Sequence, residues 1–207
     1  MINTDILAWI VVLQILFPGA PLLYGSVAAV LDMRTGLLPL GAPERGTIDA
    51  RAALMARHYG LLSLYGGLSD AEELDAQAGF EKAVTAVPLL LERADIIYGV
   101  GTVDAGSTIS YTQMVLDDEF AAGLRRMMQG IPVHDLDEEV ALIKTNTPRG
   151  NFFKIEHTRR NFRRHWQPGI LSRDTYKTWH AKSENIEQIC RRKARDILAQ
   201  HQNCSKN

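Results

Sequence analysis

The sequence predicts an α/β protein: part of a (β/α)8 barrel of the TIM type, followed by a helical tail. Helical and strand-like segments alternate over residues 1–150, which is typical of parallel strands joined by crossover helices. Three apolar segments each end in a Tyr-Gly pair, and the tyrosines lie 41 and 33 positions apart. These intervals match one strand and one helix per repeat, as in a barrel.

The first predicted element is a helix over about Ile6–Phe17, which is apolar apart from Gln14. The Asn-Thr-Asp run at positions 3–5 offers N-cap side chains, and a Pro-Gly pair ends the helix. The run is shorter than the ~20 apolar residues of a membrane span. A secretory signal needs a basic residue ahead of it, but the first basic residue is Arg34. We therefore expect a buried helix that no earlier segment covers.

The next elements alternate. Three short apolar runs bounded by glycine are predicted as buried strands: Ala20–Gly25, Leu61–Gly66 and Asp95–Gly99. Apolar positions at helical spacing predict the intervening helices: Glu44–His58, Ala71–Arg93 and Tyr111–Gln129. Pro88 is expected to kink the second of these helices, and Gly130 to end the third.

The remaining chain reads as helices over Leu136–Lys144, Thr158–Trp166 and Arg173–Gln202, with a fourth strand conceivable at Ile131–His134. Three or four strands cannot close an eight-stranded barrel, and an open parallel sheet leaves unpaired edges and bare apolar surface. The sequence therefore predicts the C-terminal half of a barrel over residues 1–150 and a basic helical tail over residues 151–207. Stability would require a second copy, a separate N-terminal polypeptide or another arrangement of the helices.

Composition narrows the class of protein. Two cysteines without a Cys-x-x-Cys pair exclude a disulfide scaffold and argue against a zinc site, which favours a cytoplasmic setting. Residues 1–150 carry a net charge of -9 and residues 151–207 a net charge of +8. The basic tail is interpreted as docking on the acidic body or as a solvated helical face, with nucleic-acid binding as the weaker alternative.

Candidate chemistry lies where the strands end. Tyr24, Tyr65 and Tyr98 each precede a glycine at a strand's carboxyl end, which is where barrel enzymes place their sites. If the rings converge, they could hold a quaternary or methylated amine by cation–π attraction of about 0.5–2 kcal/mol each. The alternative is that they are core residues with a hydroxyl at the rim. Asp70 and Asp104 follow the second and third strands and would add negative charge, although Asp70 could instead cap a helix.

The remaining motifs give weaker evidence of function. Gly99-Val100-Gly101 lacks the third glycine of a dinucleotide fingerprint, and no Ser-His-Asp order or P-loop is present. His157 is the most noticeable histidine, but the nearest other histidine, His165, is eight positions away and not at a metal-ligand spacing. No metal site is predicted.

Several motifs together resemble the trimethylamine methyltransferase family over about residues 4–200. The matching motifs are Asp5-Ile6-Leu7-Ala8, Pro18-Gly19-Ala20-Pro21, Tyr24-Gly25-Ser26, Asp32-Met33-Arg34-Thr35-Gly36, Gly41-Ala42-Pro43-Glu44, Gly66-Gly67-Leu68-Ser69-Asp70, Asp75-Ala76-Gln77-Ala78-Gly79-Phe80-Glu81-Lys82, Ile97-Tyr98-Gly99-Val100-Gly101, Gln113-Met114-Val115-Leu116-Asp117-Asp118-Glu119, Gly130-Ile131-Pro132-Val133, Glu156-His157-Thr158 and Phe162-Arg163.

The resemblance implies transfer of a methyl group from a methylated amine to a cobalt corrinoid carried by a partner protein, with no cofactor bound tightly by this chain. Some similar proteins carry pyrrolysine, whereas this chain has only standard residues. A quaternary amine, such as a betaine, is therefore the expected substrate, because it leaves as a neutral amine. The alternative is a non-catalytic fragment that self-associates or pairs with a missing half-barrel. No catalytic residue is assigned, and the expected substrate-binding residues are Tyr24, Tyr65, Gly66, Gly67, Asp70, Gln77, Tyr98, Asp104 and His157.

Overall fold

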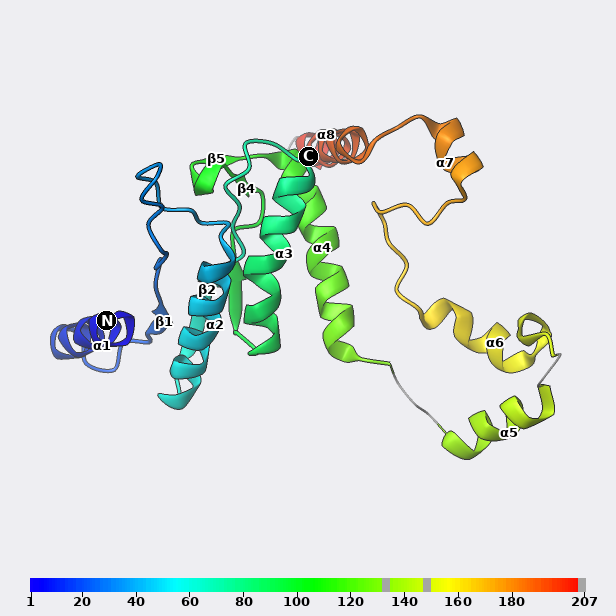
Figure 1. Ribbon diagram of the computed structural model, residues 1–207, viewed down its shortest axis with the longest axis horizontal. Helices are drawn as coiled ribbons and strands as arrows, with labels where there is room; N and C mark the ends of the chain where they lie inside the picture. Colours follow the sequence, from blue (N-terminus) through cyan, green and yellow to red (C-terminus); the bar gives the residue numbers. More distant parts are fainter. Residues whose placement is uncertain (132–134, 147–149, 205–207) are drawn as a thin grey trace.

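A parallel sheet with helices on one face forms the centre of the fold (Figure 1). The structure is a computed structural model that describes residues 1–131, 135–146 and 150–204, with side chains up to residue 201. Strands β1 (Leu23–Gly25), β2 (Leu62–Gly66) and β3 (Ile96–Tyr98) pair in that order, and both pairs are parallel. The predicted parallel α/β arrangement is confirmed, whereas the three strands form an open sheet and no closed barrel.

Helices α2 (Pro43–His58) and α3 (Ala76–Leu91) supply the covered side of the sheet. The core contains alanines of α2, Leu89 of α3 and two strand tyrosines, Tyr24 and Tyr65. Small alanine side chains let α2 approach the strands closely, so the aromatic rings fill the space between them. The predicted kink does not end α3 at Pro88, because the helix continues to Leu91.

The opposite side of the sheet is open. Leu23, Leu62 and Ile96 are 46%, 56% and 40% exposed, although all three are apolar strand residues. Alternation along each strand places them away from the helices, on the side where no described element packs. This sheet therefore buries one face and leaves an apolar face bare.

Helix α1 (Ile2–Leu16) is not the buried helix that the sequence predicts, since none of its residues is buried. Ile6 and Ile10 pack against the core, but Trp9 and Ile15 are more than half exposed. The helix also begins earlier than expected and has no side-chain cap. The expectation failed because the apolar residues of α1 are distributed around its whole circumference, and only one side of the helix contacts the core.

The Gly- and Thr-rich loop after β3 contains a small antiparallel hairpin that the sequence did not predict. Its strands are β4 (Thr102–Val103) and β5 (Thr108–Ile109), joined by the 3-10 turn η1 (Asp104–Gly106). Two-residue strands carry too little apolar alternation to be recognised. Helix α4 (Tyr111–Gln129) follows with the predicted bounds, capped by Ser110 and ended at Gly130.

The C-terminal part is helical, as predicted, but more broken. Its elements are α5 (Leu136–Asn146), η2 (Phe152–Lys154), α6 (Glu156–Asn161), η3 (Phe162–Arg164), α7 (Tyr176–Lys182) and α8 (Ile186–Cys204). The single helix predicted over Arg173–Gln202 is wrong, because Ser183 adopts a left-handed φ of 50° that ends α7. Most of the strand considered at Ile131–His134 lies outside the described residues.

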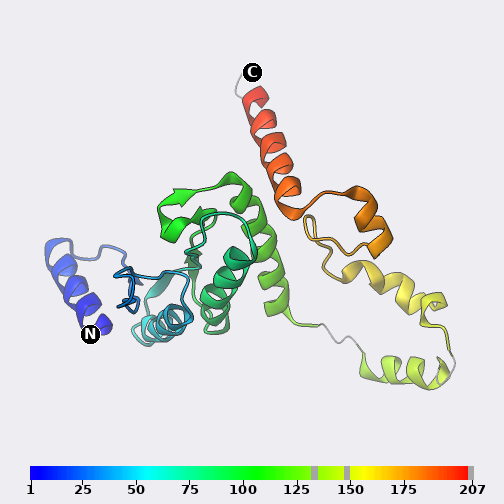
Figure 2. The same ribbon diagram turned by 45° about the horizontal axis from the view of Figure 1, so that its top comes forward.

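Helix α8 returns to the body of the fold and packs against α4, while α5 and α6 lie away from the sheet (Figures 1 and 2). The link is made by the buried Glu119 carboxylate of α4. It accepts hydrogen bonds from the backbone N–H groups of Gly169, Ile170 and Leu171, at 3.0–3.3 Å. Within the described residues, no helix is long and apolar enough to cross a membrane.

The starts of β2 and β3 are joined by side chains. The Asp95 carboxylate accepts hydrogen bonds from the backbone N–H and the hydroxyl of Ser63, at 2.8 and 2.9 Å. These bonds hold the pKa of the Asp95 carboxyl below its usual range. Because β3 has only three residues, its backbone pairs with β2 over a short length. The side-chain bonds of Asp95 extend this pairing toward the starts of both strands.

The variant Ser63→Ala should lower the free energy of unfolding by about 1 kcal/mol at pH 7 and raise the pKa of Asp95. A lowered folded-state pKa stabilises the protein above the unfolded-state pKa, and this stabilisation is lost as pH falls through the folded-state value. Urea denaturation and an NMR titration of the Asp95 carboxyl measure the two effects. Ser107→Ala, at an exposed serine, is the control. An unchanged Asp95 titration in Ser63→Ala would contradict this role.

Candidate functional site

Strand register separates the three candidate tyrosines. Tyr24 pairs with Ser63, two residues before Tyr65, so Tyr24 and Tyr65 point to the same face. Tyr65 pairs with Ile97, one residue before Tyr98, so Tyr98 points to the opposite face. The expectation that three phenols converge is therefore wrong. The Tyr-Gly pair recurs at the ends of all three strands, but in β3 it is shifted by one residue relative to β2.

Tyr24 and Tyr65 behave as core residues, since both side chains are fully buried on the helix-covered face. The Tyr24 hydroxyl donates to the Asn3 side chain of α1 at 2.7 Å, and Asn3 donates to the Tyr59 hydroxyl at 3.0 Å. Burial raises the pKa of both Tyr24 and Tyr65 above the usual phenol value. These two tyrosines thus tie α1, α2 and the sheet together.

Tyr98 alone lies on the open face, next to two of the predicted glycines. A Cβ atom at Gly66 would lie 2.9 Å from Tyr98 Cζ, so only glycine lets the ring cross there. A Cβ atom at Gly67 would lie 3.0 Å from the Ala86 Cβ, which brings α3 close to the strand end. The two glycines therefore shape the site by their small size.

A buried ion pair on α2 reaches Tyr98, and sequence reasoning missed it. Arg45 Nε lies 3.2 Å from Asp49 Oδ2, and Arg45 Nη2 lies 3.5 Å from the Tyr98 hydroxyl. Burial raises the pKa of Asp49 to about 6, although Arg45 lowers it. Among the described residues, Arg45 Nη1 and Asp49 Oδ1 have no hydrogen-bond partner. The i,i+4 spacing of Arg45 and Asp49, among alanines on the buried face of α2, was the available signal.

Asp70 organises a loop. Its carboxylate accepts hydrogen bonds from the backbone N–H groups of Leu40 and Gly41, at 2.7 and 2.9 Å. It does not cap α3, because that helix begins at Ala76 and is capped by Asp75. The Glu81 carboxylate in turn accepts from the backbone N–H of Asp70 at 2.7 Å.

The other predicted site residues are dispersed. Gln77 is exposed and donates to Glu81 at 2.8 Å. Asp104 lies in the hairpin turn with a left-handed φ of 51° and accepts from Thr108 at 3.4 Å. His157 lies in α6, away from the sheet (Figure 1). The structure therefore gathers Gly66, Gly67 and Tyr98, and not the whole predicted set.

A second buried pair holds the loop after β3. Lys82 Nζ donates to Asp117 Oδ2 at 2.9 Å and to the Gly99 carbonyl at 2.6 Å. The Gly101 backbone N–H donates to the same Asp117 oxygen at 2.7 Å, and Gln113 Nε2 donates to Asp117 Oδ1 at 2.7 Å. The loop that follows the Tyr98 strand is thus fixed to α3 and α4.

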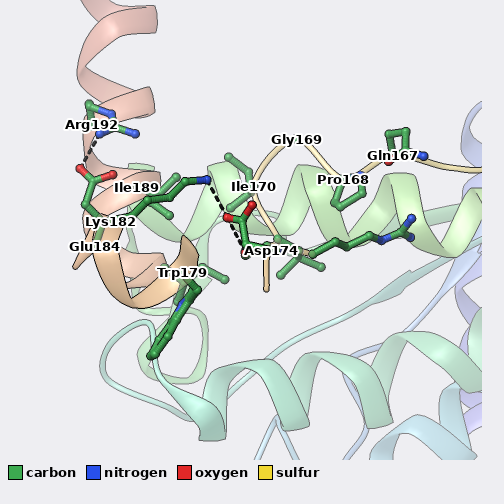
Figure 3. Close-up of a pocket in the computed structure, with 14 residues that line it drawn as sticks. Gln167, Pro168, Gly169, Ile170, Asp174, Trp179, Lys182, Glu184, Ile189 and Arg192 are labelled. Carbon is green, nitrogen blue, oxygen red and sulfur yellow. Dashed lines mark hydrogen bonds and ion pairs between the residues drawn. The ribbon is translucent and has the colours of Figure 1, made fainter. Parts of the chain in front are cut away.

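A hollow of about 840 Å³ lies elsewhere, between the 167–174 segment, α7 and α8 (Figure 3). Ion pairs of Lys182 with Asp174 and of Arg192 with Glu184 line it. It is far from the strand ends and mostly exposed, so it adds no group to the Tyr98 site. Among the described residues, no cluster of His, Cys, Asp and Glu could hold a metal ion.

The variant Lys82→Met should lower the free energy of unfolding by about 3–5 kcal/mol, because it leaves the Asp117 charge buried without its partner. Lys182→Met is the matched control, since its ion pair with Asp174 is exposed, and the expected loss is much smaller. Urea denaturation of both variants measures the difference. Equal losses in the two variants would show that the Lys82 pair does not hold this part of the fold.

Known proteins are similar to this chain over nearly its whole length. It matches the family model described as trimethylamine methyltransferase (MTTB) over residues 1–205. Trimethylamine methyltransferase MttB of Methanosarcina barkeri is 36% identical over 202 residues, which cover 97% of this chain and 41% of that protein. Glycine betaine methyltransferase of Desulfitobacterium hafniense (strain Y51) is 33% identical over 202 residues, covering 96% of this chain and 42% of that protein.

A third relative, trimethylamine methyltransferase MttB of Desulfitobacterium hafniense (strain DSM 10664 / DCB-2), is 37% identical over 180 residues. The match covers 86% of this chain and 36% of that protein. The chain thus spans about two fifths of the length of the curated relatives it matches. Because the family match runs over nearly the whole sequence, the chain belongs to the trimethylamine methyltransferase family.

Proposed function

We propose that this chain is part of a methyltransferase that takes a methyl group from a methylated amine and passes it to a corrinoid on a partner protein. The observation that carries the proposal is the family match over residues 1–205. The relatives named above act, by their names, on trimethylamine or glycine betaine. We propose the same kind of activity for this chain, which spans two fifths of their length.

The proposed architecture is a section of a (β/α)8 barrel. Its three parallel strands carry helices on one face only, as barrel strands do. The bare face with Leu23, Leu62 and Ile96 would then be the barrel interior, closed by further strands. The strands' carboxyl end, where Tyr98 lies, would be the side of the chemistry.

The substrate site is proposed at Tyr98 on this open face. Its ring offers a cation–π surface to a methylated ammonium group. The buried Arg45 guanidinium, which is paired with Asp49, donates to the Tyr98 hydroxyl and would hold the ring in position. The proposed substrate is a quaternary amine such as a betaine.

The chemistry requires little acid–base catalysis. A quaternary amine departs as a neutral amine that keeps the C–N electron pair, so no proton need be delivered to it. The partner's corrinoid supplies the nucleophile that accepts the methyl group. The chain's own task is to orient the methyl group toward that nucleophile and to exclude water.

Glycine betaine should bind to the chain or its assembly with a Kd below the millimolar range. Tyr98→Leu should weaken binding by at least about fivefold, the loss of one cation–π contact of about 1 kcal/mol. Isothermal titration calorimetry measures both, with Tyr111→Leu, at an exposed tyrosine, as the control. No binding of glycine betaine or trimethylamine at millimolar ligand would refute the proposed function.

A non-catalytic fragment that assembles with its own kind is the second candidate function. The specific observation in its favour is the bare apolar face of the sheet, together with the exposed side of α1. Such an area on a soluble protein marks an interaction surface. Assembly is compatible with either candidate, whereas amine binding is expected only of the methyltransferase.

The wild-type chain should form a dimer or a larger assembly in light scattering after size exclusion. Leu62→Glu places a charge in the middle of the bare face and should shift the chain toward the monomer. Leu136→Glu in α5, at a leucine exposed away from the sheet, should leave the assembly unchanged. A well-folded wild-type monomer would contradict the proposal that this face is covered.

A further inference from the structure

An ion pair without access to solvent lies directly beside the proposed amine site. The side chains of Arg45 and Asp49 on α2 are both 0% exposed, and Arg45 Nε lies 3.2 Å from Asp49 Oδ2. Arg45 Nη2 also donates to the Tyr98 hydroxyl at 3.5 Å. The pair is therefore one hydrogen bond away from the ring on which a cation–π contact at this site would depend.

Close packing fixes both the helix and the ring at this point. A Cβ atom at Gly46, the residue after Arg45, would overlap the Val84 carbonyl oxygen of α3, so glycine lets α2 and α3 run side by side (Figure 1). On β2, a Cβ atom at Gly66 would lie 2.9 Å from Tyr98 Cζ, so the ring lies against the strand backbone. Because neither partner can move far, the charge of the pair acts on the Tyr98 site at short range.

The net charge of the pair depends on Asp49 alone. A guanidinium keeps its positive charge in proteins, and Asp49 is the one carboxylate within ion-pair distance of Arg45 among the described residues. The neighbouring phenols, Tyr24 of β1 and Tyr65 of β2, add no charge, because burial raises the pKa of both. With Asp49 ionised the pair is neutral, and without that charge a lone guanidinium would lie beside the ring, where the low dielectric strengthens its field.

Such a pair is an inefficient way to stabilise a fold. Replacing a buried ion pair by apolar side chains of similar volume is often neutral or stabilising, because both ions lose their hydration on burial. In this pair, Arg45 Nη1 and Asp49 Oδ1 also have no hydrogen-bond partner among the described residues. A buried pair that is only partly satisfied adds little net stability. Its place beside Tyr98 therefore favours a role in the site over a role in packing alone.

We propose that Asp49 makes the Tyr98 site specific for cations, because its carboxylate neutralises Arg45 and so removes a positive charge that would repel a quaternary amine. This role rests on the function proposed above, since it requires an amine at Tyr98. Asp49 acts through Arg45 and does not touch the ligand, so it is a positioning residue. Linkage requires the reverse effect as well: a bound cation favours the ionised form of Asp49.

Deleting the two charges in turn tests this role, with choline as a probe that carries one fixed positive charge. By isothermal titration calorimetry, Asp49→Asn should bind choline at least about fivefold more weakly than the wild-type chain. Adding Arg45→Met removes the second charge and should restore at least about threefold of that affinity. Asp118→Asn, at an exposed carboxylate of α4, removes the same charge elsewhere and should change nothing. Equal affinities of the wild type and a folded Asp49→Asn would overturn the proposal, as would a double variant that binds no better than Asp49→Asn.

A pH titration of the wild-type chain gives a second readout, which serves alone if circular dichroism shows that Asp49→Asn does not fold. Burial raises the pKa of Asp49 to about 6, and Arg45 is the described charged group that lowers it. As the pH falls through this value Asp49 loses its charge, so the Kd for choline should rise at least about fivefold between about pH 8 and about pH 5. An equal Kd at both pH values would refute the role of Asp49 alone. No binding of choline or glycine betaine at either pH would refute the proposed function as well.

Discussion

Hydrogen bonds from backbone N–H groups to carboxylates are the interaction on which this fold depends. Strands of three to five residues make few ladder hydrogen bonds, so the loops at their ends need other partners. Asp70 binds the loop before α2, Asp117 the loop after β3, and Glu119 the segment before α7. The excess of acidic residues in the first 150 positions is therefore partly internal structure and not only surface charge.

The second constraint is the register between β2 and β3. A shift of one residue places Tyr98 on the face opposite to Tyr65, although the same dipeptide ends both strands. One face then becomes a core of tyrosines and alanines, and the other keeps apolar side chains and a single phenol. The candidate site therefore contains one tyrosine ring and not three. Arg45, which is paired with Asp49, contacts the hydroxyl of that ring.

Among the described residues, buried polar atoms without hydrogen-bond partners occur near the strand ends and beside Asp117. Those of Arg45 and Asp49 lie near the strand ends, and that of Gln113 lies beside the buried pair of Lys82 and Asp117. Both places combine a charge pair with a buried acceptor or donor. In each, the two charges of the pair neutralise each other, and one neighbouring polar atom has no hydrogen-bond partner among the described residues.

The sequence by itself determined the order of elements, the parallel sheet, the bounds of α4 and membership in the family, because apolar periodicity and end signals are local. It also located Gly66, Gly67 and Tyr98 at the strand ends. Only the tertiary structure decided which face each tyrosine occupies, that α1 lies on the surface, and that Arg45, Gln113 and Glu119 have buried partners. These outcomes depend on strand register and on contacts between residues as far as 56 positions apart, which no local pattern records.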